Sequence, residues 1–280
     1  MSADSHPLER LLRDGMMPHI WCEGCGNGII LNCFVRALKD IEIDVNKVVV
    51  VSGIGCIGRL SGYTNTDSYH TTHGRAIAFA TGAKLANPEL KAVVISGDGD
   101  LFAIGGNHFI HAARRNVDIQ VICANNFNYG MTGGQYGPTT PLKAWTTTTP
   151  YGNIEHPFNL VHLAAASGAV YVARWTTLHV RRLTESIKKV LQKEGFSFIE
   201  VITPCPEIYG RRNKMATGIE MMNWFKTAAE IRNASDPAEA EISPEKIVVG
   251  EFIDAEKPTY DHLLREMIKQ VQERIRGENR

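Results

Sequence analysis

The stretch that decides the fold covers residues 91–134, KAVVISGDGDLFAIGGNHFIHAARRNVDIQVICANNFNYGMTGG. Two short apolar runs, at residues 92–95 and 118–124, flank a segment with helical spacing at 103–115. Short apolar runs bounded by turn residues are typical of buried parallel strands. A strand, a helix and a second strand form a right-handed βαβ unit. We therefore predict an α/β fold, a parallel sheet with helices on both faces.

Polar residues follow both predicted strands. The motif Gly97-Asp98-Gly99-Asp100 follows the first strand, and Asn126 follows the second. Ligands of open α/β sheets bind at this carboxyl edge, where glycines and a helix N-terminus can receive phosphate. Carboxylate oxygens there suit a Mg²⁺ ion shared with a diphosphate, held by Asp98, Asn126 and a nearby carbonyl such as that of Asn128. The alternative is an ordinary turn, in which Gly-Asp-Gly is common.

Composition limits the classes of partner. The chain has 280 residues, 44% hydrophobic and 21% charged, and its 30 basic residues balance 30 acidic ones. A zero net charge gives no field to attract nucleic acid or an anionic membrane, so we expect neither partner. The first ten residues are too charged for a signal peptide, and no apolar run reaches the ~18 residues of a membrane span. We expect a cytoplasmic protein.

The alternation of helix and strand continues along the chain. We expect helices at 27–38, 76–86, 158–167, 178–194, 218–232 and 260–275, and strands at 47–52, 169–173, 196–202 and 246–252. The Gly-, Thr- and Pro-rich loop at 127–156 directly follows the second strand, which favours a functional role. We divide the chain into a lead-in at 1–20, an α/β domain at 21–206 and a C-terminal extension at 207–280. The last helix carries an apolar stripe that should pack on its own domain or on a partner subunit.

Four cysteines should meet at the same edge of the sheet. Cys22 and Cys25 form a C-x-x-C motif, and Cys56 and Cys205 each follow a strand through a glycine or proline turn. A redox dithiol explains neither Cys56 nor Cys205, whereas structural zinc and a four-iron four-sulfur cluster each need four ligands. Cys33 lies on the apolar face of a helix and should be buried.

Several motifs in the same order resemble a known family. The Gly-Asp-Gly followed by Asn-Asn matches thiamine diphosphate enzymes. Together with other segments, it resembles the β subunit of 2-oxoacid:ferredoxin oxidoreductases, closest to the 2-oxoglutarate type. The segments that carry the resemblance are 21–28, 53–58, 70–75, 97–100, 104–108, 125–135, 203–206 and 209–213.

The resemblance implies a set of site residues. Cluster ligands would be Cys22, Cys25, Cys56 and Cys205, and Mg²⁺ would be held by Asp98, Asn126 and the carbonyl of Asn128. The residues that would contact the diphosphate are Gly99, Asp100, Gly130 and Met131. The residues that would face the thiamine are Ile54, Gly55, Cys56, Ile57 and His73. His73 is also the catalytic candidate, and Cys33 and Cys123 would be core residues.

The resemblance also implies an activity and partners. The complex would oxidatively decarboxylate a 2-oxoacid, expected to be 2-oxoglutarate, to the acyl-coenzyme A and CO₂, with electrons passing through one cluster to ferredoxin. The chain lacks the second thiamine-binding domain of this family, so an α subunit should supply it, in a dimer of αβ heterodimers. The alternatives are a non-oxidative thiamine diphosphate decarboxylase or synthase, and a zinc-stabilised nucleotide-binding scaffold. Arg75, Arg114, Arg115, Arg211 and Arg212 could meet a distal substrate carboxylate, but solvation at the surface is the preferred interpretation.

Overall fold

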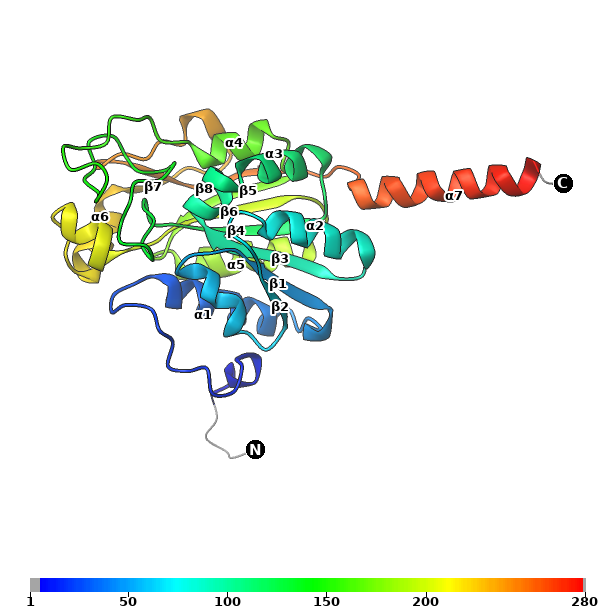
Figure 1. The fold of residues 1–280 in the computed structure, drawn as a ribbon, viewed down its shortest axis with the longest axis horizontal. Coiled ribbons are helices and arrows are strands. Elements are labelled where there is room, and N and C mark those ends of the chain that lie inside the picture. The colour runs from blue at the N-terminus through cyan, green and yellow to red at the C-terminus, as the bar shows by residue number, and fades with distance from the viewer. Residues whose placement is uncertain (1–5, 279–280) are drawn as a thin grey trace.

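The structure is a computed structural model, and it describes residues 6–278. One mostly parallel sheet forms the centre of this part of the chain (Figure 1). The strand order is β2-β1-β3-β4-β6-β5-β8-β7. The strands are β1 (Val48–Ser52), β2 (Asp67–His70), β3 (Lys91–Gly97), β4 (Ile119–Asn125), β5 (Tyr171–Thr176), β6 (Ser197–Ile202), β7 (Ala229–Ile231) and β8 (Ile247–Asp254). Pairs from β2 to β5 are parallel, and β8 joins β5 antiparallel. The predicted α/β fold is confirmed.

Helices cover both faces of the sheet (Figure 1). They are α1 (Asn27–Asp40), α2 (Ala76–Ala86), α3 (Gly106–Arg115), α4 (Leu160–Ala166), α5 (Val180–Gln192), α6 (Gly218–Ala228) and α7 (Tyr260–Glu278). Successive strand residues point to opposite faces. Val48 and Val50 accordingly enter the core that includes α1 and α5, whereas Val49 and Val51 enter the core with α2, α3 and α4.

The sheet is wider than the sequence predicted. The edge strand β2 has the polar sequence DSYH, which carries no apolar run, so sequence reasoning missed it. The helix expected at 218–232 ends at Ala228, and the chain continues as β7. Both β7 and β8 belong to the predicted C-terminal extension, yet they continue the same sheet.

The last helix, α7, projects away from the sheet (Figure 1). Its apolar stripe does not pack on the rest of the chain, because these side chains are 46–54% exposed: Leu263, Met267, Ile268, Val271 and Ile275. The base of the helix is nevertheless fixed, since Asp261 is buried and its Oδ1 accepts from the backbone N–H of Asp118 at 3.3 Å. The helix is therefore an anchored arm.

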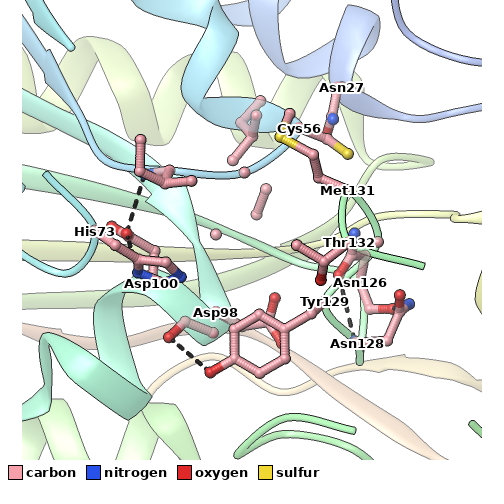
Figure 2. A pocket seen from close by; sticks show the side chains of 17 residues that line it. Asn27, Cys56, His73, Asp98, Asp100, Asn126, Asn128, Tyr129, Met131 and Thr132 are labelled. Carbon is pink, nitrogen blue, oxygen red and sulfur yellow. Dashed lines mark hydrogen bonds and ion pairs between the residues drawn. The ribbon is translucent and has the colours of Figure 1, made fainter. Parts of the chain in front are cut away.

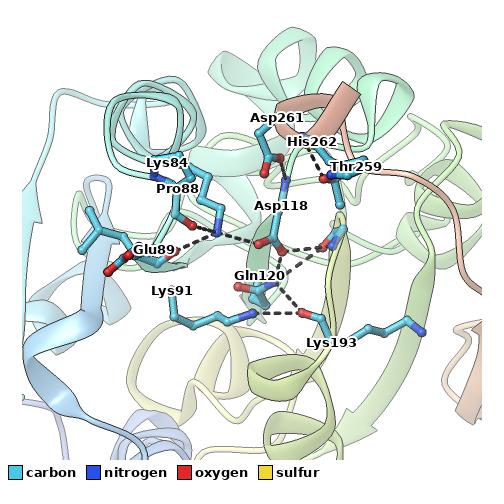
Figure 3. Close-up of polar contacts among 12 residues, drawn as sticks. Lys84, Pro88, Glu89, Lys91, Asp118, Gln120, Lys193, Thr259, Asp261 and His262 are labelled. Atoms are coloured by element: carbon cyan, nitrogen blue, oxygen red, sulfur yellow. Dashed lines mark hydrogen bonds and ion pairs between the residues drawn. The ribbon is translucent and has the colours of Figure 1, made fainter. Parts of the chain in front are cut away.

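Asp118 also belongs to a buried ion pair at the amino edge of the sheet (Figure 3). The Nζ of Lys84 lies 2.6 Å from Asp118 Oδ2, and both side chains are 6% exposed. The same ammonium donates to the carbonyls of Pro88 and Leu90, each at 2.9 Å. Burial alone would raise the pKa of Asp118, but Lys91 and Lys84 overcome it and lower that pKa.

Replacement of Lys84 by methionine is expected to destabilise the chain by about 3–5 kcal/mol, because it leaves the buried Asp118 carboxylate without its ion-pair partner. Lys47→Met is the matched control. Its ion pair with Glu89 is exposed, 57% and 77%, so the cost should stay below about 1 kcal/mol. Urea unfolding of both variants measures the difference, and equal midpoints would contradict it. Because the pKa of Asp118 is lowered in the folded chain, the ion pair contributes its full stabilisation at pH values above the pKa of an unfolded Asp. That stabilisation is lost as the pH falls through the pKa of Asp118 in the folded chain.

Candidate functional site

A cavity lies at the carboxyl ends of β1, β3 and β4, where the sequence predicted a ligand site (Figure 2). Asp98 follows β3, Asn126 follows β4, and both line the cavity. The loop after β1 and the start of the long loop after β4 close it from two sides. The predicted cofactor residues that line it are Ile54, Gly55, Cys56, Ile57, His73, Gly99, Asp100, Gly130 and Met131.

The carboxylate of Asp98 is buried, with 2% exposure. The hydroxyl of Thr139 donates to its Oδ2, and no ion pair to a basic side chain is found for it among residues 6–278. Burial raises the pKa of Asp98 to about 7, against the hydrogen bonds from Thr139 and neighbouring backbone groups that lower it. Such a carboxylate is stabilised in its charged form by a cation.

Two asparagines that line the same cavity as Asp98 carry further oxygen atoms of the kind that a hard cation binds. Asn128 also lines the cavity, and its Oδ1 is buried without a hydrogen-bond donor. Its Nδ2 donates to the main-chain carbonyl of Asn126 at 2.9 Å, which fixes the Asn128 side chain against the backbone after β4. Carboxylate, amide and carbonyl oxygens are the ligands that Mg²⁺ takes. Asp98, Asn126 and the carbonyl of Asn128, the predicted metal ligands, are thus of the oxygen type that a divalent cation takes.

Asp100 ties two loops of the site to the end of β3. Its Oδ1 accepts from the backbone N–H of Ile54 at 3.0 Å and of Gly74 at 2.7 Å, and its Oδ2 accepts from Ser96 Oγ at 2.8 Å. A Cβ on Gly53 would lie 1.9 Å from Asp100 Oδ2, so the loop can approach only as glycine. The carboxylate is thus engaged within the protein, and only the backbone N–H of Asp100 is left for the diphosphate contact that the resemblance implies.

His73 lines the same cavity, and its side chain is 30% exposed. Its Nδ1 lies 2.8 Å from Asp100 Oδ1, although the pair lacks the alignment of a hydrogen bond. His70 lies elsewhere, exposed, with its Nδ1 3.2 Å from Ser52 Oγ. The two side chains therefore make different contacts, and only that of His73 lines the cavity.

The four predicted cluster cysteines line a second cavity: Cys22, Cys25, Cys56 and Cys205. It shares Cys56, Asn126, Gly130 and Met131 with the first cavity, so the two are contiguous. Burial, with smaller contributions from the neighbouring cysteines, raises the pKa of Cys25 to about 12 and that of Cys56 to about 11. Thiolates at these positions therefore need a bound cation.

Close packing holds the cysteine segments together. The backbone N–H of Gly26 donates to the Pro204 carbonyl at 3.3 Å, and a Cβ on Gly26 would lie 2.2 Å from Thr203 Oγ1. Trp21 Nε1 donates to the Cys56 carbonyl at 2.6 Å. The C-x-x-C segment is thus fixed against the loops that carry the other two cysteines.

Comparison with known proteins decides the family. Residues 53–201 match the model of the thiamine pyrophosphate enzyme, C-terminal TPP binding domain. The chain is 52% identical over 267 residues to the 2-oxoglutarate synthase subunit KorB of Methanocaldococcus jannaschii, covering 95% of this chain and 98% of the relative. The chain is a β subunit of the 2-oxoacid:ferredoxin oxidoreductase family, of the 2-oxoglutarate type.

Other relatives agree with this assignment of the β subunit. The KorB subunit of Archaeoglobus fulgidus is 57% identical over 195 residues, covering 70% of this chain and 73% of the relative. The solved structure of 2-oxoglutarate:ferredoxin oxidoreductase from Magnetococcus marinus, with 2-oxoglutarate, coenzyme A and succinyl-CoA bound, superposes with a TM-score of 0.86. Its sequence is 33% identical, and the match covers 96% of this chain and 92% of that chain.

Sequence reasoning missed several residues that shape the β-subunit site. Thr139, which donates to Asp98, lies 41 residues further along the chain, in the loop that the sequence marked only as functional. Tyr129 packs against Gly99, where a Cβ would lie 2.3 Å from its ring. Cys33 and Cys123 are buried in the two cores, as expected. Within residues 6–278, no helix is long and apolar enough to cross a membrane.

Proposed function

We propose that this β subunit supplies the diphosphate-binding half of a thiamine diphosphate site and one four-iron four-sulfur cluster to a complex that converts 2-oxoglutarate to succinyl-CoA and CO₂. The observation that carries the proposal is the pair of contiguous cavities. One is lined by Asp98, Asn126 and Asn128, and the other by four cysteines. The relatives named 2-oxoglutarate synthase support the choice of substrate.

Mg²⁺ is proposed to join the diphosphate to the protein. Asp98, Asn126 and the carbonyl of Asn128 would hold it, while Gly99, Asp100, Gly130 and Met131 would contact the phosphate oxygens. The buried Asp98 carboxylate, which has no ion pair to a basic side chain among residues 6–278, supports this assignment. A charge-neutralising ion is needed there because a diphosphate beside a buried carboxylate would otherwise be repelled.

A cluster explains the cysteine cavity better than zinc. Among residues 6–278, no three His, Cys, Asp or Glu side chains form a group that could hold a single metal ion. Zinc requires four ligands at about 2.0–2.3 Å from one ion. In a four-iron cluster each thiolate binds a different iron, so four cysteines that line one cavity without converging on a single point suit it.

The chemistry that bound thiamine diphosphate supplies is an electron sink for the bond to the departing CO₂. His73 would serve proton transfer in the cavity. Its Nδ1 faces Asp100, which leaves Nε2 as the ring nitrogen able to exchange a proton with a bound group. Two electrons would then leave singly through the cluster to ferredoxin, and coenzyme A would take the acyl group in a reversible reaction.

An α subunit is proposed to cover the long loop after β4 and to bring the second thiamine-binding domain. The loop presents exposed apolar side chains, of which Tyr151 and Ile154 are 98% and 89% exposed. Large exposed apolar side chains grouped on one loop are typical of a protein interface. The subunit names of the relatives also imply a partner, and we propose a dimer of αβ heterodimers.

A substrate panel tests the proposed function. The complex of this chain with its α subunit is assayed anaerobically with several 2-oxoacids, with and without coenzyme A, and with oxidised ferredoxin as acceptor. We expect 2-oxoglutarate to have the highest kcat/KM and ferredoxin reduction to require coenzyme A. Aldehyde formation without acceptor reduction would instead indicate the non-oxidative alternative.

A further inference from the structure

A surface groove lies beside the cysteine cavity. We call it the arginine groove, and it is lined by Arg13, Met16, Ile20, Arg59, Tyr63 and His70, together with backbone of the same segments. Ile20 and Arg59 also line the cysteine cavity. The groove therefore borders the cysteine cavity, in which Cys22 is exposed.

The charge of the groove is positive. Arg13 and Arg59 are both exposed, and no Asp or Glu is among the described residues that line it. Arg13 Nη2 donates only to neutral oxygens, the carbonyl of Thr66 and Ser68 Oγ, each at 3.3 Å. Glu207, an acid that lines the cysteine cavity, is paired with Arg211 at 2.6 Å. Two unneutralised guanidinium groups thus face outward beside the cysteines.

Exposed apolar side chains accompany the two arginines. Met16, Met17 and Ile20 are 43%, 47% and 71% exposed. Methionine and arginine are both enriched in protein interfaces relative to the rest of a protein surface, and methionine adapts to different partner shapes. This combination is typical of a docking surface for another protein.

The groove is also preformed. The backbone N–H of Ile20 donates to Tyr63 Oη at 3.0 Å, and the N–H of Arg13 donates to the Tyr63 carbonyl at 2.9 Å. The rings of Trp21 and Tyr63 lie 5.0 Å apart. Tyr63 thus fixes both ends of the segment that carries the methionines, so this segment would lose little conformational entropy when a partner binds.

We propose that the arginine groove docks the electron acceptor, a small one-electron carrier protein whose redox centre is surrounded by acidic side chains. The proposal rests on the proposed function, since the donor is the cluster held by the four cysteines. One electron passes from the reduced cluster to the oxidised carrier in each encounter, with no proton or group transferred. Opposite charges speed such an encounter, and the small, transient interface keeps it reversible.

Charge reversal in the intact αβ complex tests this. Arg13→Glu and Arg59→Glu should each lower kcat/KM for an acidic two-cluster ferredoxin about tenfold at low salt. The difference from wild type should shrink towards 0.5 M salt, roughly the range where the Debye length falls to a few ångströms. Arg13 does not line the cysteine cavity, so Arg13→Glu should keep the electron paramagnetic resonance spectrum and the rate with methyl viologen, a small cationic acceptor.

Arg114→Glu is the matched control, because Arg114 is exposed on α3 near the amino edge of the sheet, opposite the cysteines. If Arg13→Glu and Arg59→Glu had the same kcat/KM for ferredoxin as this control, the proposal that the groove docks the carrier would be wrong. Loss of the α subunit from the variants would overturn it too, since the groove would then be a subunit interface. A wild-type complex without iron or viologen reduction would contradict the proposed function itself, and with it the donor that the groove needs.

Discussion

Asp98→Ala is expected to weaken Mg²⁺-dependent binding of thiamine diphosphate by roughly 100-fold or more, the order of effect seen when metal sites lose a supporting group. The reason is the position of Asp98, buried at the end of β3 with no basic side chain paired to it among the described residues. Without its carboxylate, Asn126 and Asn128 offer the ion only neutral oxygens. The diphosphate then has no metal bridge to the protein.

Calorimetric titration of the αβ complex with thiamine diphosphate, with Mg²⁺ and with a chelator, measures this effect. Asp40→Ala is the control, because Asp40 is exposed at the end of α1, away from the cavity. We expect Mg²⁺ to improve cofactor affinity in wild type and in this control, but not in Asp98→Ala. Equal affinities in all three proteins would show that Asp98 holds no metal.

Cys22→Ala is expected to remove the iron–sulfur cluster and to abolish ferredoxin reduction, because three remaining thiolates leave one iron without a protein ligand. Cys22 suits this test because it lines the cysteine cavity but not the cofactor cavity, whereas Cys56 lines both. Thiamine diphosphate affinity should therefore remain close to that of wild type, while iron and acid-labile sulfide per chain decrease.

Cys33→Ala provides the matched control, since Cys33 is fully buried in the core with α1 and α5. It should lose some packing but no iron. A Cys22→Ala complex that keeps its iron and still reduces ferredoxin would remove Cys22 from the ligand set. Zinc in place of iron in wild type would favour the scaffold interpretation instead.

The sequence predicted the location of the site because parallel strands deliver their carboxyl ends to one edge. Asp98, Asn126, Cys56 and Cys205 each follow a strand closely, so their meeting needed only the strand assignments. The strands could be assigned because their apolar runs are continuous and bounded by turn residues. Cys22 and Cys25 do not follow a strand, and they were placed at this edge only because a metal site with Cys56 and Cys205 needs four ligands. Zinc and a four-iron cluster both need four ligands, so the zinc alternative stayed open.

Contacts between distant segments escaped prediction. The role of Asp100 depends on the loops at Ile54 and Gly74, 46 and 26 residues away, and no local pattern marks it. The helix predicted from residue 103 begins at Gly106, after a π-helical segment at Gly99–Ile104 that no propensity signals. Likewise, the stripe on α7 predicted a packed helix but not the direction in which the arm leaves the sheet.

Iron analysis combined with electron paramagnetic resonance of the anaerobically purified αβ complex tests the central claim most directly. The claim is that Cys22, Cys25, Cys56 and Cys205 hold a redox cluster beside the thiamine diphosphate cavity. We predict about four iron atoms per β subunit, as a four-iron cluster requires, and a reduced-cluster signal that develops on addition of 2-oxoglutarate and coenzyme A. Zinc without iron, or a cluster that the substrates leave oxidised, would contradict the account.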